Sequence, residues 1–246
     1  MDFYESIAPY YHHIFPLNPD QAVFTRSVFL HSEGISLLEV GCGIGSLSFE
    51  LSTTYPTIIG IDLDKAMLAK AEETKAALTT LENPPLFYQV NMLSMMDTFH
   101  TAQFDGILCF GNTLVHLDSE EQVLDFFSQC HMALKEGGKL LFQILNYDKI
   151  LQLCITSLPV TDNELIRFVR TYAFPQHSEK IDFITTLTIK ETHQTIRNKI
   201  TLLPLKKNTL LKLLLQAGFN KLCFYGNYHS QPFSMESEIL VVKAER

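Results

Sequence analysis

The sequence predicts an α/β protein with a mostly parallel sheet, helices on both faces and a small antiparallel β insertion. Three observations carry this prediction. Apolar strand-like runs alternate with helical runs through residues 20–145, as in β-α units with parallel strands. The apolar run at residues 36–40 enters a glycine-rich turn and then a helix. Residues 165–203 instead alternate apolar and polar side chains with period two, although imperfectly, which indicates antiparallel strands.

Composition limits the classes of function. The 246 residues are 46% hydrophobic, so the chain can bury a sizeable core, and we read it as a single domain, residues 1–246. The formal net charge of −8 argues against an electrostatic nucleic-acid binder, which needs a basic face to neutralise phosphates.

Cysteine usage and the lack of a membrane signal predict a cytoplasmic protein. The five cysteines are widely spaced and contain no CxxC pair, which favours reduced core thiols over disulfides or a metal site. No apolar run reaches the length of a membrane span, and the first residues lack a signal-peptide pattern, so we expect no membrane partner.

The turn after residue 40 has the chemistry of a nucleotide site. Gly41, Gly43 and Gly45 form G-x-G-x-G after Glu39, and the helix that follows begins with free amides beside the turn. Glycines allow close approach of a ligand and positive φ. A dinucleotide fingerprint would need its third glycine at residue 46, which is Ser46, and this disfavours an NAD-type oxidoreductase.

The second predicted strand, residues 57–61, ends in Asp62, where an acid can accept hydrogen bonds from ribose hydroxyls. An ordinary tight turn is the alternative, but Glu39 and Asp62 both in register count against it. With these residues the chain resembles the class I S-adenosylmethionine-dependent methyltransferases, whose first motif is E/D-x-G-x-G-x-G. The resemblance implies a Rossmann-like seven-stranded sheet with S-adenosylmethionine as cofactor and S-adenosylhomocysteine as product. The cofactor-binding residues that it implies are Glu39, Gly41, Cys42, Gly43, Gly45, Asp62, Leu63, Asn91, Met92 and Phe110.

The N-terminal residues 1–19 are rich in aromatic side chains and form either a packing arm or a lid. Tyr4, Ala8 and Tyr11 match the Y-x-x-x-A-x-x-Y segment of the resembled family, which implies a lid near the methionine end of the cofactor. A helix is predicted next, over residues 20–31, because its apolar residues recur at core spacing.

The middle of the chain continues the β-α pattern. A helix is predicted at residues 65–81, a third strand at 86–90 and a fourth at 104–110. The Asn-Pro-Pro-Leu sequence at residues 83–86 precedes the third strand and is read as a loop, because a nucleobase-gripping motif would follow the fourth strand. A helix at 120–134 and a Lys-Glu-Gly-Gly turn at 135–138 lead into a fifth strand at 139–145.

Two sheet-edge sequences narrow the resemblance. The G-N-x-x-x-H-L sequence at residues 111–117 and N-Y-D at 146–148 look like the glycine N-methyltransferase-like group, where these edges face the methyl group and a small acceptor. The likeness implies catalytic roles for His116, Tyr11 and Asn112 and acceptor contacts from Asn112, His116 and Tyr147. Each has a structural alternative: Asn112 caps its loop, His116 flanks a helix, and residues 146–148 form a capping turn.

The insertion between residues 151 and 205 is predicted to cover the pocket as an antiparallel β cap, with strands at 165–174, 181–191 and 195–203. Arg170 lies among apolar neighbours there, so it contacts either an acidic group of the acceptor or a structural ion-pair partner. A helix at 206–217 follows, and strands at 221–225 and 237–243 are expected to close the main sheet as an antiparallel pair.

These features predict methyl transfer from S-adenosylmethionine to a small-molecule acceptor, an amine or amino-acid-like compound, by in-line displacement. His116 is the first candidate for a general base, with Tyr11 and Asp148 as weaker ones. A cofactor-binding module without turnover is the main alternative. The sequence leaves open the acceptor, the attacked atom and homo-oligomerisation.

Overall fold

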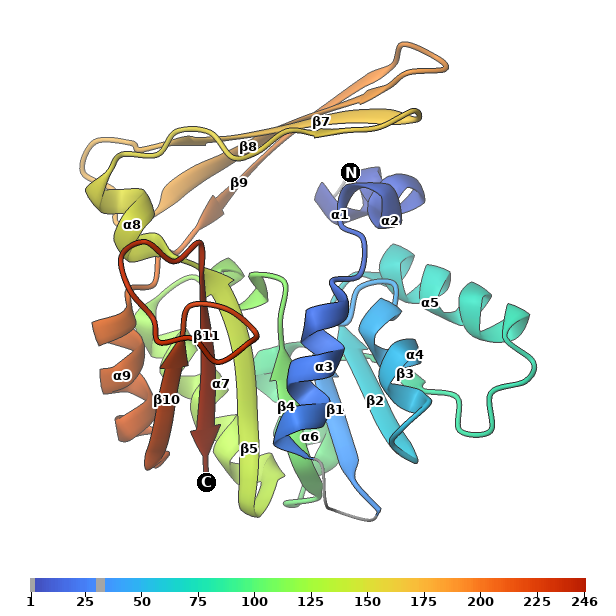
Figure 1. Cartoon of the computed structure of the whole chain (residues 1–246), viewed down its shortest axis with the longest axis vertical. Coiled ribbons are helices and arrows are strands. Elements are labelled where there is room, and N and C mark those ends of the chain that lie inside the picture. Colours follow the sequence, from blue (N-terminus) through green and yellow to red (C-terminus); the bar gives the residue numbers. More distant parts are fainter. Residues whose placement is uncertain (1–2, 30–33) are drawn as a thin grey trace.

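The computed structural model describes residues 3–29 and 34–246, and its core is a seven-stranded sheet in the order β10-β11-β5-β4-β1-β2-β3 (Figure 1). All neighbouring pairs are parallel except those of β11, which runs antiparallel to both β5 and β10. The strands are β1 Ser36–Val40, β2 Thr57–Asp62, β3 Leu86–Gln89, β4 Phe104–Cys109, β5 Leu134–Leu145, β10 Lys221–Tyr225 and β11 Ile239–Glu245. The predicted α/β class and mostly parallel sheet are confirmed.

Helices cover both faces of this sheet because successive side chains of a buried strand point to opposite sides. Leu37 packs in one apolar cluster with helices α3 and α4, whereas Leu38 belongs to the cluster formed with α7 and α9. These helices are α3 Pro19–Val28, α4 Ser46–Ser52, α7 Glu120–Ala133 and α9 Lys207–Gln216. Helices α5 Lys65–Ala77 and α6 Met95–Phe99 follow β2 and precede β4, respectively.

A second, four-stranded antiparallel sheet lies beyond the carboxyl end of the main sheet (Figure 1). Its strands are β6 Thr161–Asp162, β7 Ile166–Ala173, β8 Ile181–Ile189 and β9 Thr195–Leu202. Helix α8 Tyr147–Gln152 leads into it from β5. Three of its strands match the prediction, and β6 is an additional two-residue pairing with β7.

The N-terminal helices lie between the two sheets (Figure 1). They are α1 Phe3–Ile7, the 3-10 turn η1 Ala8–Tyr10 and α2 Tyr11–Ile14. Phe3 and Ile7 pack in one apolar cluster with Phe168 and Leu187, which project from β7 and β8. The N-terminal segment is therefore anchored to the second sheet by apolar burial.

Several element ends differ from the sequence expectations. Helix α3 ends at Val28, short of the predicted residue 31, which lies outside the described residues. Helix α5 ends at Ala77, where Leu78 leaves helical geometry with ψ 64°. Residues 135–138, expected as a turn, are part of β5 but pair with no residue of β4: they form an irregularity where the register shifts between Phe104 and Gly106, and Gly137 has φ +72°. Strand β11 starts at Ile239, two residues late, because Ser237 donates its amide to Ser234 in a turn.

Within residues 3–29 and 34–246, no helix has both the length and the apolar character needed to cross a bilayer.

Candidate active site

A cavity of about 430 Å³ opens at the carboxyl ends of β1, β2 and β4. This is the edge of an α/β sheet where ligands bind, and the volume lies in the range of small-molecule sites. Its walls come from the glycine turn, the ends of β2 and β3, the loop after β4 and the N-terminal helices. The lining residues are Tyr4, Tyr11, Val40, Gly41, Gly43, Ile61, Asp62, Leu63, Asp64, Met67, Val90, Asn91, Met92, Leu93, Phe110, Gly111, Thr113, His116, Leu117, Asp118 and Gln122.

The glycine turn, Gly41 to Gly45, is tied to the end of β2. The amides of Gly41 and Cys42 both donate to the Ile61 carbonyl, at 2.8 and 3.0 Å. Gly41 has φ +71°, and a Cβ there would lie 2.5 Å from Thr113 Cγ2. The residue must therefore be glycine both for its conformation and for its contact with the loop after β4.

Asp62 lies between the glycine turn and the cavity. One carboxylate oxygen accepts the Gly43 amide at 2.8 Å, and the other accepts the Asp64 amide at 2.9 Å. Burial raises the pKa of Asp62, while these amides act in the opposite direction. Each oxygen keeps acceptor capacity, which suits a pair of ribose hydroxyls.

Three residues predicted to bind cofactor lie behind the turn and do not line the cavity: Glu39, Cys42 and Gly45. Glu39 is 7% exposed and accepts a hydrogen bond from the Ser48 hydroxyl. Its burial raises the pKa of Glu39 to about 8, so the carboxyl is largely protonated at neutral pH. A Cβ on Gly45 would lie 2.6 Å from Phe87 Cζ, so this glycine makes room for β3.

The other predicted cofactor residues, Leu63, Asn91, Met92 and Phe110, all line the cavity. Asn91 lies two residues after the end of β3, and its side-chain oxygen accepts the Leu93 amide at 2.9 Å. That bond uses one lone pair of the oxygen, and the side-chain NH₂ group remains available to donate to a ligand. Leu63 is 64% exposed and offers an apolar surface beside Asp62.

The N-terminal helices bring aromatic side chains to the cavity. Tyr4 Oη lies 2.9 Å from His116 Nε2, and both residues line the cavity together with Tyr11. Burial and the nearby carboxylates of Asp62 and Glu39 raise the pKa of Tyr11. Tyr11 is therefore a neutral phenol at physiological pH, which argues against its use as a general base.

Asn112 and Tyr147 lie beside the cavity and are not part of its lining. Asn112 has φ +68°, accepts the Leu145 amide at 3.0 Å and donates to Tyr147 Oη at 3.0 Å. Tyr147 is 1% exposed in the main core. Asn112 thus fastens the loop after β4 to the end of β5, in agreement with its structural alternative.

The N-Y-D sequence caps two helices. Asn146 accepts the Lys149 amide at 3.1 Å as the N-cap of α8. Asp148 accepts the Lys207 amide at 2.9 Å at the first turn of α9. Neither Asn146 nor Asp148 lines the cavity.

Arg170 lies on β7, outside the cavity lining. Its Nη2 donates to the Pro159 carbonyl at 2.7 Å, and its guanidinium lies 6.0 Å from the ring centroids of Phe15 and Phe168. Among the described residues no carboxylate forms an ion pair with it. The structural ion pair that was the alternative role of Arg170 is therefore not found among these residues.

The sequence prediction missed several cavity residues. Tyr4 belongs to the Y-x-x-x-A-x-x-Y segment, but within this segment the resemblance implies a catalytic role for Tyr11 alone. Asp118 and Gln122 line the cavity from the start of α7, where Gln122 Oε1 accepts the Asp118 amide at 2.8 Å. The sequence feature that could have indicated these two residues is their i, i+4 spacing at the start of a helix, next to the G-N-x-x-x-H-L loop. Across residues 3–29 and 34–246, no group of three or more His, Cys, Asp or Glu is arranged to hold a metal ion.

Comparison with known proteins agrees with this geometry. A family model described as a methyltransferase domain matches residues 37–138, from β1 to the start of β5. A protein of Geobacillus sp. (strain WCH70) that is named as a methyltransferase is 31% identical over 134 residues, 54% of this chain and 51% of that protein. The chain thus spans about half the length of the first relatives that it matches. The glycine/sarcosine N-methyltransferase of Aphanothece halophytica is 24% identical over 78% of this chain and 69% of that protein.

Among solved structures, an S-adenosylmethionine-dependent methyltransferase from Clostridium acetobutylicum ATCC 824 superposes with a TM-score of 0.82, covering 99% of both chains at 18% identity. At this identity the likeness concerns the fold. Together with the methyltransferase domain at residues 37–138, it supports the resemblance of this chain to the class I S-adenosylmethionine-dependent methyltransferases. The predicted methyltransferase domain and its fold are confirmed.

Proposed function

We propose that this protein transfers the methyl group of S-adenosylmethionine to a small amine or amino-acid-like acceptor. The observation that carries the proposal is one cavity that joins the glycine turn and Asp62 to Tyr4, Tyr11 and His116. The first group suits a nucleoside, and the second suits a polar acceptor. The amine class is supported by the similarity to a glycine/sarcosine N-methyltransferase over 78% of this chain.

The residues of the glycine turn fit the cofactor. Gly41 and Gly43 expose backbone to the cavity, and Asp62 keeps free acceptor capacity for ribose hydroxyls. Asn91 is assigned to the adenine edge as a donor, with Leu63, Met92 and Phe110 as apolar contacts. When bound, S-adenosylmethionine supplies an electrophilic methyl group on its sulfonium sulfur. The roles assigned to Glu39, Cys42 and Gly45 are indirect, because these residues support the turn from behind.

On the acceptor side, His116 is proposed to take a proton from the attacking amine, since an amine attacks only in its neutral form. Tyr4 shares a hydrogen bond with His116 and orients its ring. Tyr11 closes the cavity and excludes water as a neutral phenol. Asn112 and Tyr147 hold the loop after β4 in place and act on the acceptor through that loop.

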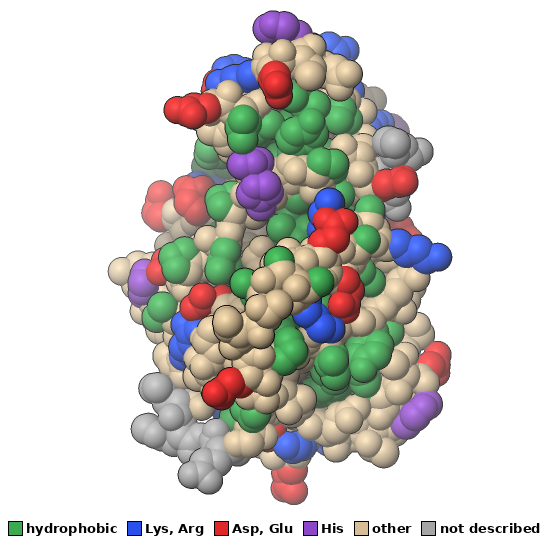
Figure 2. Space-filling view, turned by 90° about the vertical axis from the view of Figure 1, so that its right-hand side faces the viewer, with side chains coloured by type: hydrophobic (Ala, Val, Ile, Leu, Met, Phe, Trp, Pro, Cys, Tyr) green, Lys and Arg blue, Asp and Glu red, His purple; other side chains and the backbone are tan. Residues whose placement is uncertain are grey.

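We further propose that the acceptor is a small molecule, that no nucleic acid is modified, and that the protein works in the cytoplasm. The face drawn in Figure 2 intersperses acidic and basic side chains and shows no continuous basic patch. A net charge of −8 opposes phosphate binding. The five free cysteines suit a reducing compartment.

A screen for S-adenosylhomocysteine release tests the proposed function. The full-length protein is incubated with S-adenosylmethionine and panels of small amines, amino acids and phenols, with RNA and DNA as further arms. We expect turnover with a member of the amine or amino-acid panels only. Turnover on nucleic acid would contradict the proposal, and cofactor binding without turnover on any panel would favour a binding module.

A further inference from the structure

The underside of the second sheet, which faces the N-terminal helices, carries a row of polar side chains. In the strand register Thr185 of β8 lies between Arg170 of β7 and Asn198 of β9. Asn198 donates to Ser6 Oγ of α1 at 2.8 Å, which places this row on the side of the N-terminal helices. The row interrupts an otherwise apolar underside, with Phe168, Leu187 and Ile196 on one side and Tyr172, Phe183 and Ile200 on the other.

This row and its neighbour Tyr172 contain unpaired polar atoms. Three buried side-chain nitrogen or oxygen atoms have no hydrogen-bond partner among the described residues: Arg170 Nε, Tyr172 Oη and Thr185 Oγ1. Thr185 is 1% exposed and Tyr172 is 4% exposed, so water does not satisfy their hydroxyls easily. All three project from the same face of two adjacent strands, β7 and β8. Arg170 and Tyr172 are two residues apart on β7, and Thr185 of β8 is paired with Arg170.

Buried polar atoms without a hydrogen-bond partner destabilise a fold, and a bound ligand can supply the missing partner. A buried hydroxyl or N–H without a partner loses its hydration and gains no hydrogen bond. Arg170 adds a positive charge that no described carboxylate neutralises. Two hydroxyls and a guanidinium N–H on one surface form a donor set for an oxyanion.

Side-chain interactions link this surface to the loop after β4, part of which lines the cavity. Asn112, next to the cavity residues Gly111 and Thr113, donates to Tyr147 Oη. The hydroxyls of Tyr147 and Tyr172 interact electrostatically, although no hydrogen bond of good geometry joins them. Arg170 is two residues from Tyr172 on the same face of β7, about 7 Å further along the strand.

We propose that Arg170, Thr185 and Tyr172 bind an oxyanion at the end of the acceptor that is remote from the methylated atom. The inference rests on the proposed methyl transfer and specifies its substrate: an anionic acceptor whose amine and oxyanion are separated by a spacer of several bonds. The anion lies under β7 and β8, and the amine reaches the cavity near His116. Carboxylates and phosphonates share the chemistry that this surface recognises.

The test uses two series of probes, ω-amino carboxylates and ω-aminoalkyl phosphonates of increasing chain length, with alkylamines that lack an anionic group as the reference. Each is titrated by calorimetry into full-length protein saturated with S-adenosylhomocysteine. We expect affinity to rise with chain length to an optimum in at least one anionic series, and the tighter series identifies the oxyanion. Arg170→Met should weaken that binding about tenfold to a hundredfold and leave the binding of alkylamines without an anionic group unaffected.

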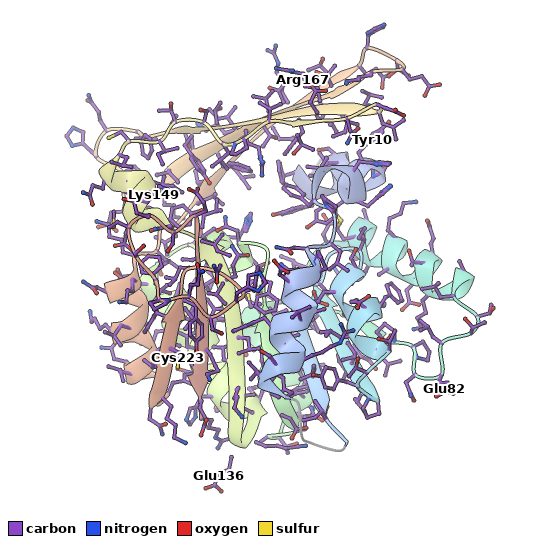
Figure 3. All side chains as sticks on the ribbon, viewed as in Figure 1. Tyr10, Glu82, Glu136, Lys149, Arg167 and Cys223 are labelled. Carbon is purple, nitrogen blue, oxygen red and sulfur yellow. The ribbon has the colours of Figure 1, made fainter. Side chains whose placement is uncertain are left out.

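Arg167→Met is the matched control. Arg167 lies three residues away on the opposite face of β7, where it pairs with Asp162 at 2.7 Å, and Figure 3 shows it on the outer side of the sheet. Its substitution should leave probe affinity unchanged. The proposal is overturned if the anionic probes bind the wild-type protein no better than alkylamines without an anionic group do, or if both arginine variants lose affinity equally.

Thr185→Val separates binding from structure. Valine has nearly the same shape without the hydroxyl, so the ligand-free variant should melt at a higher temperature than the wild-type protein while binding the anionic probe more weakly. Thr186→Val, on the outer face, is the control for the substitution itself. A lower melting temperature for Thr185→Val with unchanged probe affinity would assign the hydroxyl a structural role and contradict the proposal. Methyl transfer to a neutral amine would then still stand by itself.

Discussion

At the scale of single residues, Glu39 and Asp62 are two acids near the glycine turn that differ in burial and in hydrogen-bond partners. Asp62 accepts two backbone amides and faces the cavity. Glu39 is nearly fully buried, with the Ser48 hydroxyl as its hydrogen-bond partner. The difference in environment makes Asp62 suited to contact a ligand and Glu39 suited to support the turn.

Glu39 predicts a pH dependence of stability. Its pKa is raised in the folded state to about 8 from 4.5, so the folded protein holds a proton that the unfolded chain releases. This contribution to stability is fully present below pH 4.5 and is lost as pH rises through about 8. Urea denaturation of ligand-free protein at pH 5 and pH 8 should therefore show a smaller loss of stability for Glu39→Gln than for the wild-type protein. Glu136→Gln, at an exposed position distant from the site (Figure 3), should behave like the wild type; equal losses in all three proteins would refute the assigned pKa.

His116 predicts a loss of turnover without a loss of cofactor. His116→Ala removes a proposed proton acceptor, so kcat on the identified amine should fall by about 10²- to 10⁴-fold. Affinity for S-adenosylmethionine should stay within about twofold, because the nucleoside contacts are assigned to other residues. The exposed His229, which pairs with Asp20, provides the control His229→Ala. A His116→Ala variant that loses the cofactor, or keeps full turnover, would show that the acceptor pocket is misplaced.

At the scale of elements, the segment after β5 is organised by helix capping. Asn146 caps α8, and Asp148 reaches the first turn of α9, which joins two elements that are distant in the sequence. These bonds explain an acidic residue at 148 without any part in proton transfer.

Asp148 therefore predicts a change of stability and not of chemistry. Asp148→Ala should lower the free energy of unfolding by about 1 kcal/mol, because the Lys207 amide loses its acceptor. Asp148→Asn retains an acceptor oxygen and should recover most of that stability. Both variants should keep kcat within about twofold under folding conditions. Loss of turnover in Asp148→Asn at full stability would instead reveal a general base.

The elements differ in how well the sequence predicts them. Strand β10 was predicted with its observed bounds, because its apolar run is short and follows the turn at Ala217, Gly218 and Phe219. The start of β5 was missed, because Gly137 and Gly138 suggest a turn locally, whereas pairing with β4 extends the strand to Leu134. Tertiary pairing overrides local propensity there.

The candidate site divides in the same way. Asp62, Gly41 and Gly43 line the cavity as expected, because a strand-turn-helix motif fixes their position locally. The contact of Tyr4 with His116 joins residues 112 positions apart, and no local pattern encodes such a pairing. The polar row under the second sheet likewise depends on the register of three strands.

At the scale of the whole molecule, the second sheet and the N-terminal helices lie over the carboxyl end of the main sheet (Figure 1). The main sheet carries the residues that are proposed to contact the nucleoside, and the second sheet anchors the N-terminal helices through an apolar cluster that includes Phe3 and Phe168. The proposed acceptor site lies between these two parts. The cofactor is therefore assigned to the main sheet, and the acceptor is assigned to the space between the main sheet and the second sheet with the N-terminal helices.

Calorimetric titration of S-adenosylmethionine into wild-type protein and Asp62→Ala tests the central claim most directly. Removing the carboxylate that is assigned to the ribose hydroxyls should cost about 1.5–3 kcal/mol, or roughly a tenfold to hundredfold loss of affinity. Asp97→Ala, an exposed acid outside the cavity lining, should bind like the wild type. Equal affinity in all three proteins would contradict the account, because it would remove Asp62 from the cofactor site.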